Sequence, residues 1–179
     1  MAKVHISKLD AAVRQLREAI NMFFRNGDAV AIHSLASASQ EVLESLGLAK
    51  GIKSVRRLMM EMIHPERQKE VADKMAEAKN FFKHAGKDSS RILEFNTDTT
   101  EFVLMDAVLQ HHYLTGEKVP LFVAYNLWMY AKHPDIVVLS PEQKAIYDAL
   151  TNGFDPRNRD LFLQMVPVFE QTAQNRSGK

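Results

Sequence analysis

The chain of 179 residues contains no cysteine. This absence excludes disulfide bonds, thiolate metal ligands and thiol nucleophiles, and it fits a reducing compartment. The first ten residues lack the apolar run of a signal peptide. The longest mostly apolar stretch, residues 119–131, is shorter than the about 20 residues that a membrane-spanning helix needs. We therefore expect a cytoplasmic protein that makes no use of a membrane.

Several catalytic signatures are also absent from the sequence. It has no Gly-rich phosphate loop, no His-Glu-x-x-His motif, no calcium-binding loop and no nucleophile elbow. The net charge of +1 argues against a globally basic nucleic-acid binder. The charge is uneven, however, because residues 50–91 contain eleven Lys and Arg against six Asp and Glu, a net charge of +5. Either a solvated helical face or a polyanion-binding site explains this basic segment.

The hydrophobic content of 46% is enough for one buried core. Apolar residues recur every three or four positions behind Ser7, an N-cap candidate, which predicts a helix over residues 7–25. Similar patterns and caps predict helices over 28–47, 54–63, 65–86, 98–114, 120–132, 140–151 and 155–174. Residues 1–179 should form a single all-α domain, a bundle of about seven or eight helices.

Some local features refine this prediction. The first two helices should form an antiparallel hairpin. Asp98 with Glu101, and Asp155 with Pro156, are expected to begin helices, and Pro167 should kink the last one. Residues 86–100 should be a loop, residues 136–139 are the only strand-like run, and residues 175–179 should be a disordered tail. The expected core contains Leu16, Ile20, Phe23, Leu35, Val42, Leu43, Phe81, Leu104, Leu121 and Trp128.

The most suggestive motif is Lys79-Asn80-Phe81-Phe82-Lys83-His84, near the end of a long predicted helix. A histidine in the last helical turn feels the negative end of the helix dipole, which favours its charged form. Lys79 and His84 are offset around the helix axis and could flank a phosphate. Alternatively, His84 caps the helix while the two phenylalanines anchor it in the core.

This motif, Lys79-Asn80-x-x-x-His84 in an all-helical domain, resembles the signature of HEPN-domain ribonucleases. The resemblance implies a dimeric protein that acts on RNA without a metal ion or other cofactor, at a cleft between two protomers. Lys79 would hold the phosphate, Asn80 would orient it, and His84 would transfer the proton. Lysine stands where the family has arginine, and an ammonium does not reproduce the bidentate arginine fork. The implied protein is therefore active or catalytically degenerate.

Other segments also resemble known sequences. Residues 32–36, 80–84 and 93–96 are similar to a group of bacterial proteins with no assigned activity. Within them, His33 is expected to be a partly buried, hydrogen-bonded histidine and not a ligand.

Two further functions remain open. One is a non-enzymatic regulatory module that binds a protein partner or itself. The other is a bundle that holds a metal, through Glu101, Asp106, His111 and His112, or a small ligand. The spacing of those four residues scatters them around one helix. Phe122, Tyr125, Trp128 and Met129 are aromatic and methionine side chains that fit either a ligand pocket or a plain core.

The Leu43→Asp substitution tests the predicted core. A carboxylate on the apolar stripe should cost at least about 4 kcal/mol of unfolding free energy, because the buried charge would have no partner. Circular dichroism should then show no cooperative melting transition. A soluble variant that melts cooperatively would show that the stripe is assigned to the wrong face.

Overall fold

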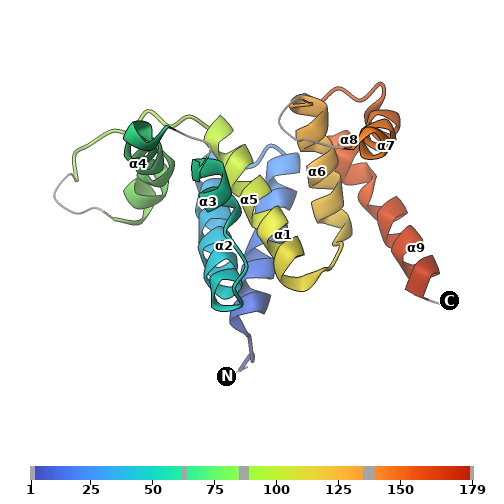
Figure 1. The fold of residues 1–179 in the computed structure, drawn as a ribbon, viewed down its shortest axis with the longest axis horizontal. Coiled ribbons are helices and arrows are strands. Elements are labelled where there is room, and N and C mark those ends of the chain that lie inside the picture. Colours follow the sequence, from blue (N-terminus) through green and yellow to red (C-terminus); the bar gives the residue numbers. More distant parts are fainter. Residues whose placement is uncertain (1–2, 62–63, 85–88, 135–139, 178–179) are drawn as a thin grey trace.

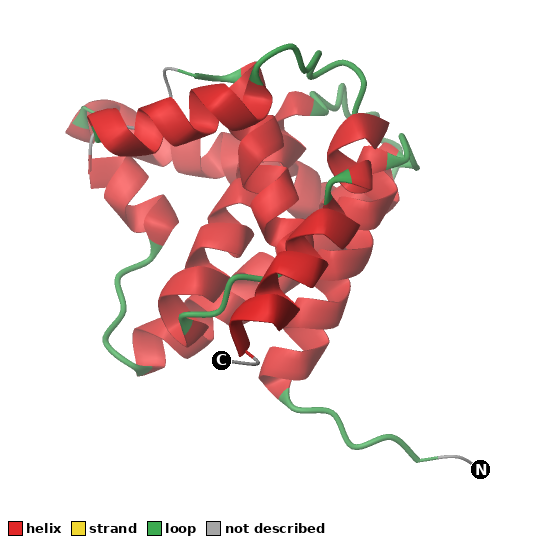
Figure 2. Ribbon diagram, turned by 90° about the vertical axis from the view of Figure 1, so that its right-hand side faces the viewer, coloured by secondary structure: helices red, strands yellow, loops and turns green. Residues whose placement is uncertain are grey.

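The computed structural model describes residues 3–61, 64–84, 89–134 and 140–177, and these residues form only helices and loops (Figure 2). The helices are α1 (Lys8–Phe24), α2 (Ala29–Ala49), α3 (Val55–Glu61), α4 (Pro65–Lys83), α5 (Asp98–Thr115), α6 (Pro120–Lys132), α7 (Pro141–Thr151), α8 (Asp160–Gln164) and α9 (Val166–Ser177). The predicted all-α class is confirmed. The strand-like residues 136–139 lie outside the described residues. Within the described ranges, no helix is both long and apolar enough to cross a bilayer.

Helices α1, α2 and α5 form the centre of the molecule (Figure 1). The predicted α1–α2 hairpin is present, and the hydroxyl of Ser39 on α2 donates to the carbonyl of Ala12 on α1 at 2.8 Å. Helix α5 runs parallel to α2, because His33 lies opposite Thr100 and Gln40 opposite Asp106. Helix α4 lies at one end of the molecule, whereas α7, α8 and α9 lie at the other (Figure 1).

The main core contains an aromatic cluster shared by α1, α6 and α8, formed by Phe23, Phe24, Tyr125, Trp128 and Phe162. The predicted core residues on these central helices are buried, namely Leu16, Ile20, Phe23, Leu43, Leu104, Leu121 and Trp128. Leu35 and Val42 are partly buried against them. Phe81 is only partly buried and lies apart from the main core, because α4 packs at the edge of the bundle. Burial of one such large side chain contributes roughly 1.5–3 kcal/mol.

Helix ends with a local signature are where the sequence places them. Ser7 with Asp10 and Ser140 with Gln143 form capping boxes. Gly116 ends α5 in the left-handed conformation at φ 73°. Pro65, Pro120 and Pro141 each begin a helix, as their missing N–H group allows.

The predicted cap pair of Asp98 and Glu101 is wrong. Thr97 occupies the N-cap of α5 without a side-chain cap bond, and Asp98 is the first helical residue. Glu101 is buried and binds Lys132 instead. The Glu101 carboxylate, which the local pattern assigns to a cap of α5, is therefore used in an ion pair with Lys132 of another helix.

The predicted helix over residues 155–174 is also wrong in its bounds. The carboxylate of Asp155 accepts the backbone N–H of Arg157, which makes a turn, and α8 begins only at Asp160. Helix α9 is separate from α8 and has Pro167 as its second residue, where the missing N–H group is tolerated. Helix α9 continues to Ser177, beyond the predicted end at Gln174, so residues 175–177 of the expected tail are helical. Helix α4 ends at Lys83, short of the predicted end.

Gly47 provides a test of the α2–α5 contact. A methyl group at this position would overlap the side-chain amide of Gln110, which is fully buried and accepts the backbone N–H of Val55 at 3.3 Å. Gly47→Ala should therefore lower the unfolding free energy by about 1–2 kcal/mol, although alanine is the better helix former. Urea denaturation measures the change. The same substitution in a Gln110→Ala background should cost nothing, and an equal loss in both backgrounds would contradict the proposed overlap.

Candidate functional site

The structure separates the three residues of the predicted ribonuclease motif. The Lys79 side chain is 19% exposed and turns toward α2, where its ammonium binds Glu41. Asn80 and His84 are exposed, and the backbone N–H of His84 donates to the carbonyl of Asn80 at 3.1 Å. All three residues are described, and no hydrogen bond joins their side chains. His84 is the C-cap residue of α4 and has an extended backbone, so it lies just beyond the last helical turn in which the sequence predicts it.

Glu41 on α2 is a member of this site that the sequence does not indicate. Its carboxylate binds the ammonium of Lys79 and lies 3.3 Å from the ammonium of Lys83. Burial alone would raise the pKa of Glu41, but the two ammonium groups outweigh burial and lower it. The site thus contains a carboxylate, two ammonium groups and, one residue after Lys83, an imidazole.

His33 belongs to α2, and its buried side chain contacts Thr100 of α5 and Phe82 of α4. It is 1% exposed, its Nδ1 lies 3.0 Å from the Thr100 hydroxyl, and the rings of Phe82 and Phe95 contact it edge-on. Burial, together with the positive charge of Lys79, lowers the pKa of His33 to about 4. The prediction of a hydrogen-bonded histidine is confirmed, although the side chain is fully and not partly buried.

A second buried polar pair lies further along the α2–α5 contact. The side-chain amide of Gln40 donates to Asp106 at 2.8 Å. Burial, followed by the negative charge of Glu44, raises the pKa of Asp106 to about 6. The Asp106 side chain is buried beside a cavity of about 30 Å³. That volume suits one water molecule.

The residues proposed as metal ligands do not converge. Glu101 binds Lys132, Asp106 binds Gln40, His111 packs on Phe122, and His112 lies 3.2 Å from the carbonyl of Glu117. Among the described residues, no group of three His, Asp or Glu side chains is placed to hold a metal ion. Tyr125, Trp128 and Met129 belong to the core, and Phe122 packs between the core and a cavity beside His111.

Glu101 is the centre of a charged cluster that joins α5, α6 and the segment before α8. Its side chain is 2% exposed, and its two oxygens lie 2.6 and 2.7 Å from the ammonium of Lys132. His133 lies 3.3 Å away and Arg159 lies 3.7 Å away. The guanidinium of Arg159 also stacks 3.9 Å above the ring of Phe23.

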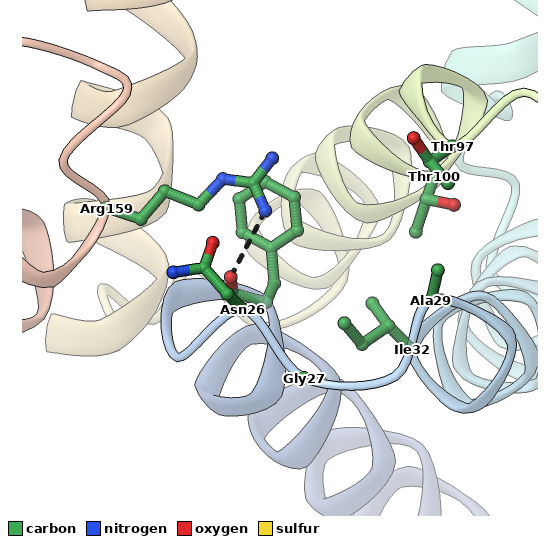
Figure 3. Close-up of a pocket in the computed structure, with 8 residues that line it drawn as sticks. Asn26, Gly27, Ala29, Ile32, Thr97, Thr100 and Arg159 are labelled. Atoms are coloured by element: carbon green, nitrogen blue, oxygen red, sulfur yellow. Dashed lines mark hydrogen bonds between the residues drawn. The ribbon is translucent and has the colours of Figure 1, made fainter.

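Arg159 lines a pocket of about 170 Å³ between the α1–α2 turn, the start of α5 and the segment before α8 (Figure 3). Arg159 and Asn26 lie on one side of it, and Thr97 and Thr100 lie on the other. Its remaining lining residues are Phe23, Gly27, Ala29 and Ile32. Sequence patterns give no sign of this pocket, because its residues come from three segments far apart in the chain.

Comparisons of the chain with models of protein families, with curated proteins and with solved structures found no match. The resemblance to HEPN-domain ribonucleases therefore stays a hypothesis that depends on the motif at residues 79–84.

The buried acid and the buried histidine should give opposite pH dependences of stability. The pKa of Asp106 rises on folding from 3.8 to about 6, so its contribution to stability falls as pH rises through that window. The pKa of His33 falls on folding from 6.5 to about 4, so its contribution is lost as pH falls through that window. The two effects should largely cancel in the unmodified protein.

Asp106→Asn should uncover this cancellation. Relative to the unmodified protein, its unfolding free energy should rise by about 1–3 kcal/mol between about pH 4 and about pH 6, because the cost of ionising the buried carboxyl is removed. For His33→Gln, the unfolding free energy relative to the unmodified protein should instead fall as pH rises from about 4 to 6.5. Urea denaturation at a series of pH values measures both differences, and parallel stability curves for all three proteins would contradict the assignment.

Proposed function

We propose that this chain binds RNA at the face where α2 meets the C-terminal end of α4, as an active or degenerate metal-independent ribonuclease. The observation that carries the proposal is the grouping of Glu41, Lys79 and Lys83 next to the exposed His84. Lysine side chains supply the phosphate contacts that dominate affinity for RNA. Histidine changes its charge between about pH 5 and pH 8, as proton transfer at neutral pH requires.

The proposed cleavage is an internal transesterification. The neutral imidazole of His84 takes the proton of the ribose 2′-hydroxyl, and the 2′-oxygen attacks the adjacent phosphorus. The bond from phosphorus to the 5′-oxygen breaks, and that oxygen takes a proton from an acid, which in a dimer would be the protonated His84 of the second protomer. The products are a 2′,3′-cyclic phosphate and a 5′-hydroxyl. Lys83 would stabilise the negative charge on the phosphoryl oxygens.

Glu41 gives the proposal a specific consequence. Its carboxylate occupies the two ammonium groups that a phosphate would need, so RNA must compete with it. A Glu41→Gln substitution keeps the shape of the side chain and removes the competing charge. This variant should bind RNA more tightly, by up to about tenfold, if the lysines contact phosphate.

The first experiment incubates the purified protein with end-labelled single-stranded RNA in EDTA. We expect cleavage to 2′,3′-cyclic phosphate ends, and we expect His84→Ala to lower the rate by about 10²–10⁴-fold. The control is His64→Ala, because the His64 side chain is 85% exposed just before the other end of the same helix. Equal cleavage by the His84→Ala variant would show that the activity has another source.

A binding measurement separates a degenerate enzyme from a protein with no role in RNA binding. Lys83→Ala should weaken RNA binding and reduce its salt dependence, whereas Lys69→Ala, at a site 91% exposed and paired with Asp73, should change both much less. Binding without cleavage would support the degenerate form. If RNA is neither bound nor cleaved, the proposal is wrong.

That outcome would favour the alternative of a protein-interaction module. The specific observation behind this alternative is the exposure of large apolar side chains near the C-terminal end of the chain. Ile146 and Leu150 on α7 are 58% and 40% exposed, and Val168 on α9 is 60% exposed. Light scattering, which measures the mass in solution, would then show whether the chain assembles with itself.

A further inference from the structure

The pocket beside Arg159 has features of a binding site for a small anion, separate from the proposed RNA face. Its walls come from the α1–α2 turn, the start of α5 and the segment before α8 (Figure 3). Glu41 belongs to α2, twelve residues after the first residue of that helix. The cavity of about 170 Å³ is much larger than the about 30 Å³ that one water occupies. It is smaller than the pockets of about 300–1,000 Å³ that take drug-sized ligands. The size therefore indicates a ligand of only a few heavy atoms.

Arg159 supplies a held positive charge at one side of the pocket. Its guanidinium stacks on Phe23 and donates to the carbonyl of the same residue at 3.4 Å. Glu101 forms an ion pair with it at 3.7 Å and is bonded more closely, through both oxygens, to Lys132. Because a guanidinium has five N–H donors, several remain for a ligand. A planar carboxylate matches the fork of these donors.

Thr100 supplies a buried hydrogen-bond donor at the opposite side. The residue is 4% exposed, and its hydroxyl lies 3.0 Å from Nδ1 of His33. The other ring nitrogen, Nε2, is buried without a partner, so a proton placed there would be an unsatisfied donor. The favoured tautomer of the neutral ring therefore has its proton on Nδ1 and donates it to Thr100. The Thr100 hydroxyl then keeps its own hydrogen as a donor that His33 does not use.

Asn26 adds a polar group just after the C-terminal end of α1. Its φ of 52° is the only positive value among the non-glycine residues of the described chain. Glycine would adopt this conformation at lower cost, yet the position has an asparagine whose side chain lines the pocket beside Arg159 (Figure 3). This left-handed residue ends α1 in a Schellman motif, in which the N–H groups of Asn26 and Gly27 donate to the carbonyls of Phe23 and Met22 at 3.2 and 2.8 Å. The helix end therefore holds the asparagine side chain at the edge of the pocket.

We propose that this pocket binds a small carboxylic acid, with its carboxylate on Arg159 and Asn26 and a hydroxyl or keto oxygen toward Thr97 and Thr100. Between these polar ends the lining includes Ala29 and Ile32, which suit a short hydrocarbon segment. This apolar part favours a hydroxy acid or keto acid over inorganic phosphate, which has no apolar surface.

The test is a titration of the isotope-labelled protein, followed by the backbone amide NMR signals of Gly27, Ala29 and Thr97. The probes are lactate, acetate and inorganic phosphate at millimolar concentrations. We expect saturable shifts with lactate, weaker shifts with acetate because the second polar contact is missing, and the weakest with phosphate. Absence of saturable shifts with lactate would overturn the proposal, and so would phosphate binding more tightly than both acids.

Variants then locate the site. Arg159→Gln should weaken lactate binding by at least about tenfold, because a charge-assisted hydrogen bond is lost. The matched control is Arg157→Gln, since the side chain of Arg157 is 91% exposed and paired with Asp155. Lactate affinity should be unchanged in this control.

Asn26→Gly keeps the test decisive if Arg159→Gln fails to fold. Glycine relieves the positive φ, so the variant should melt at the same temperature as the unmodified protein or higher, and lactate binding should weaken by about threefold or more. Thr97→Val should also weaken binding, because it removes a hydroxyl at the other side of the pocket. Unchanged affinity in both of these variants would show that lactate binds elsewhere.

Discussion

The carboxylate of Glu101 is the group on which the arrangement of the C-terminal half depends. A buried charge without partners would cost several kcal/mol, so Glu101 requires the cations that surround it. Glu101 belongs to α5, Lys132 belongs to α6, and Arg159 precedes α8. Both cations therefore bind a carboxylate that α5 supplies. Removal of one partner of such a buried pair typically costs about 3–5 kcal/mol. The position of Arg159, and with it one wall of the pocket, follows from this requirement.

A row of buried polar contacts sets how α2 and α5 meet. His33 lies opposite Thr100 and Gln40 opposite Asp106, and further along the helices the buried amide of Gln110 packs against Gly47. Apolar side chains alone tolerate sliding of one helix along another, whereas the His33–Thr100 and Gln40–Asp106 hydrogen bonds form at only one relative position of the two helices. The contact is therefore specific, and the cost of the specificity is visible in the shifted pKa values of His33 and Asp106.

The parts of the fold that depend on neighbouring residues could be predicted from the sequence. The capping boxes at Ser7 and Ser140 and the left-handed Gly116 each involve residues within one turn, so local patterns identify them. The roles of Glu41 and Glu101 could not be predicted, because their partners lie far away in the chain. Glu41 pairs with a lysine 38 residues later, and Glu101 with one 31 residues later. The motif at residues 79–84 predicts that Lys79, Lys83 and His84 lie near the end of α4. It does not predict the Glu41 carboxylate that contacts both lysines.

The parallel orientation of α2 and α5 also has a kinetic consequence. Two neighbouring helices that are parallel need a connection that leads from the end of the first back to the start of the second. For α2 and α5 this connection is residues 50–97, which include α3 and α4. The α1–α2 hairpin closes over a short turn, whereas the α2–α5 contact must first close this long loop, so the hairpin should form earlier. Loop-closure entropy grows slowly with length, by about 0.6 kcal/mol for each doubling. The basic segment can therefore change in length over evolution at little cost to the three central helices.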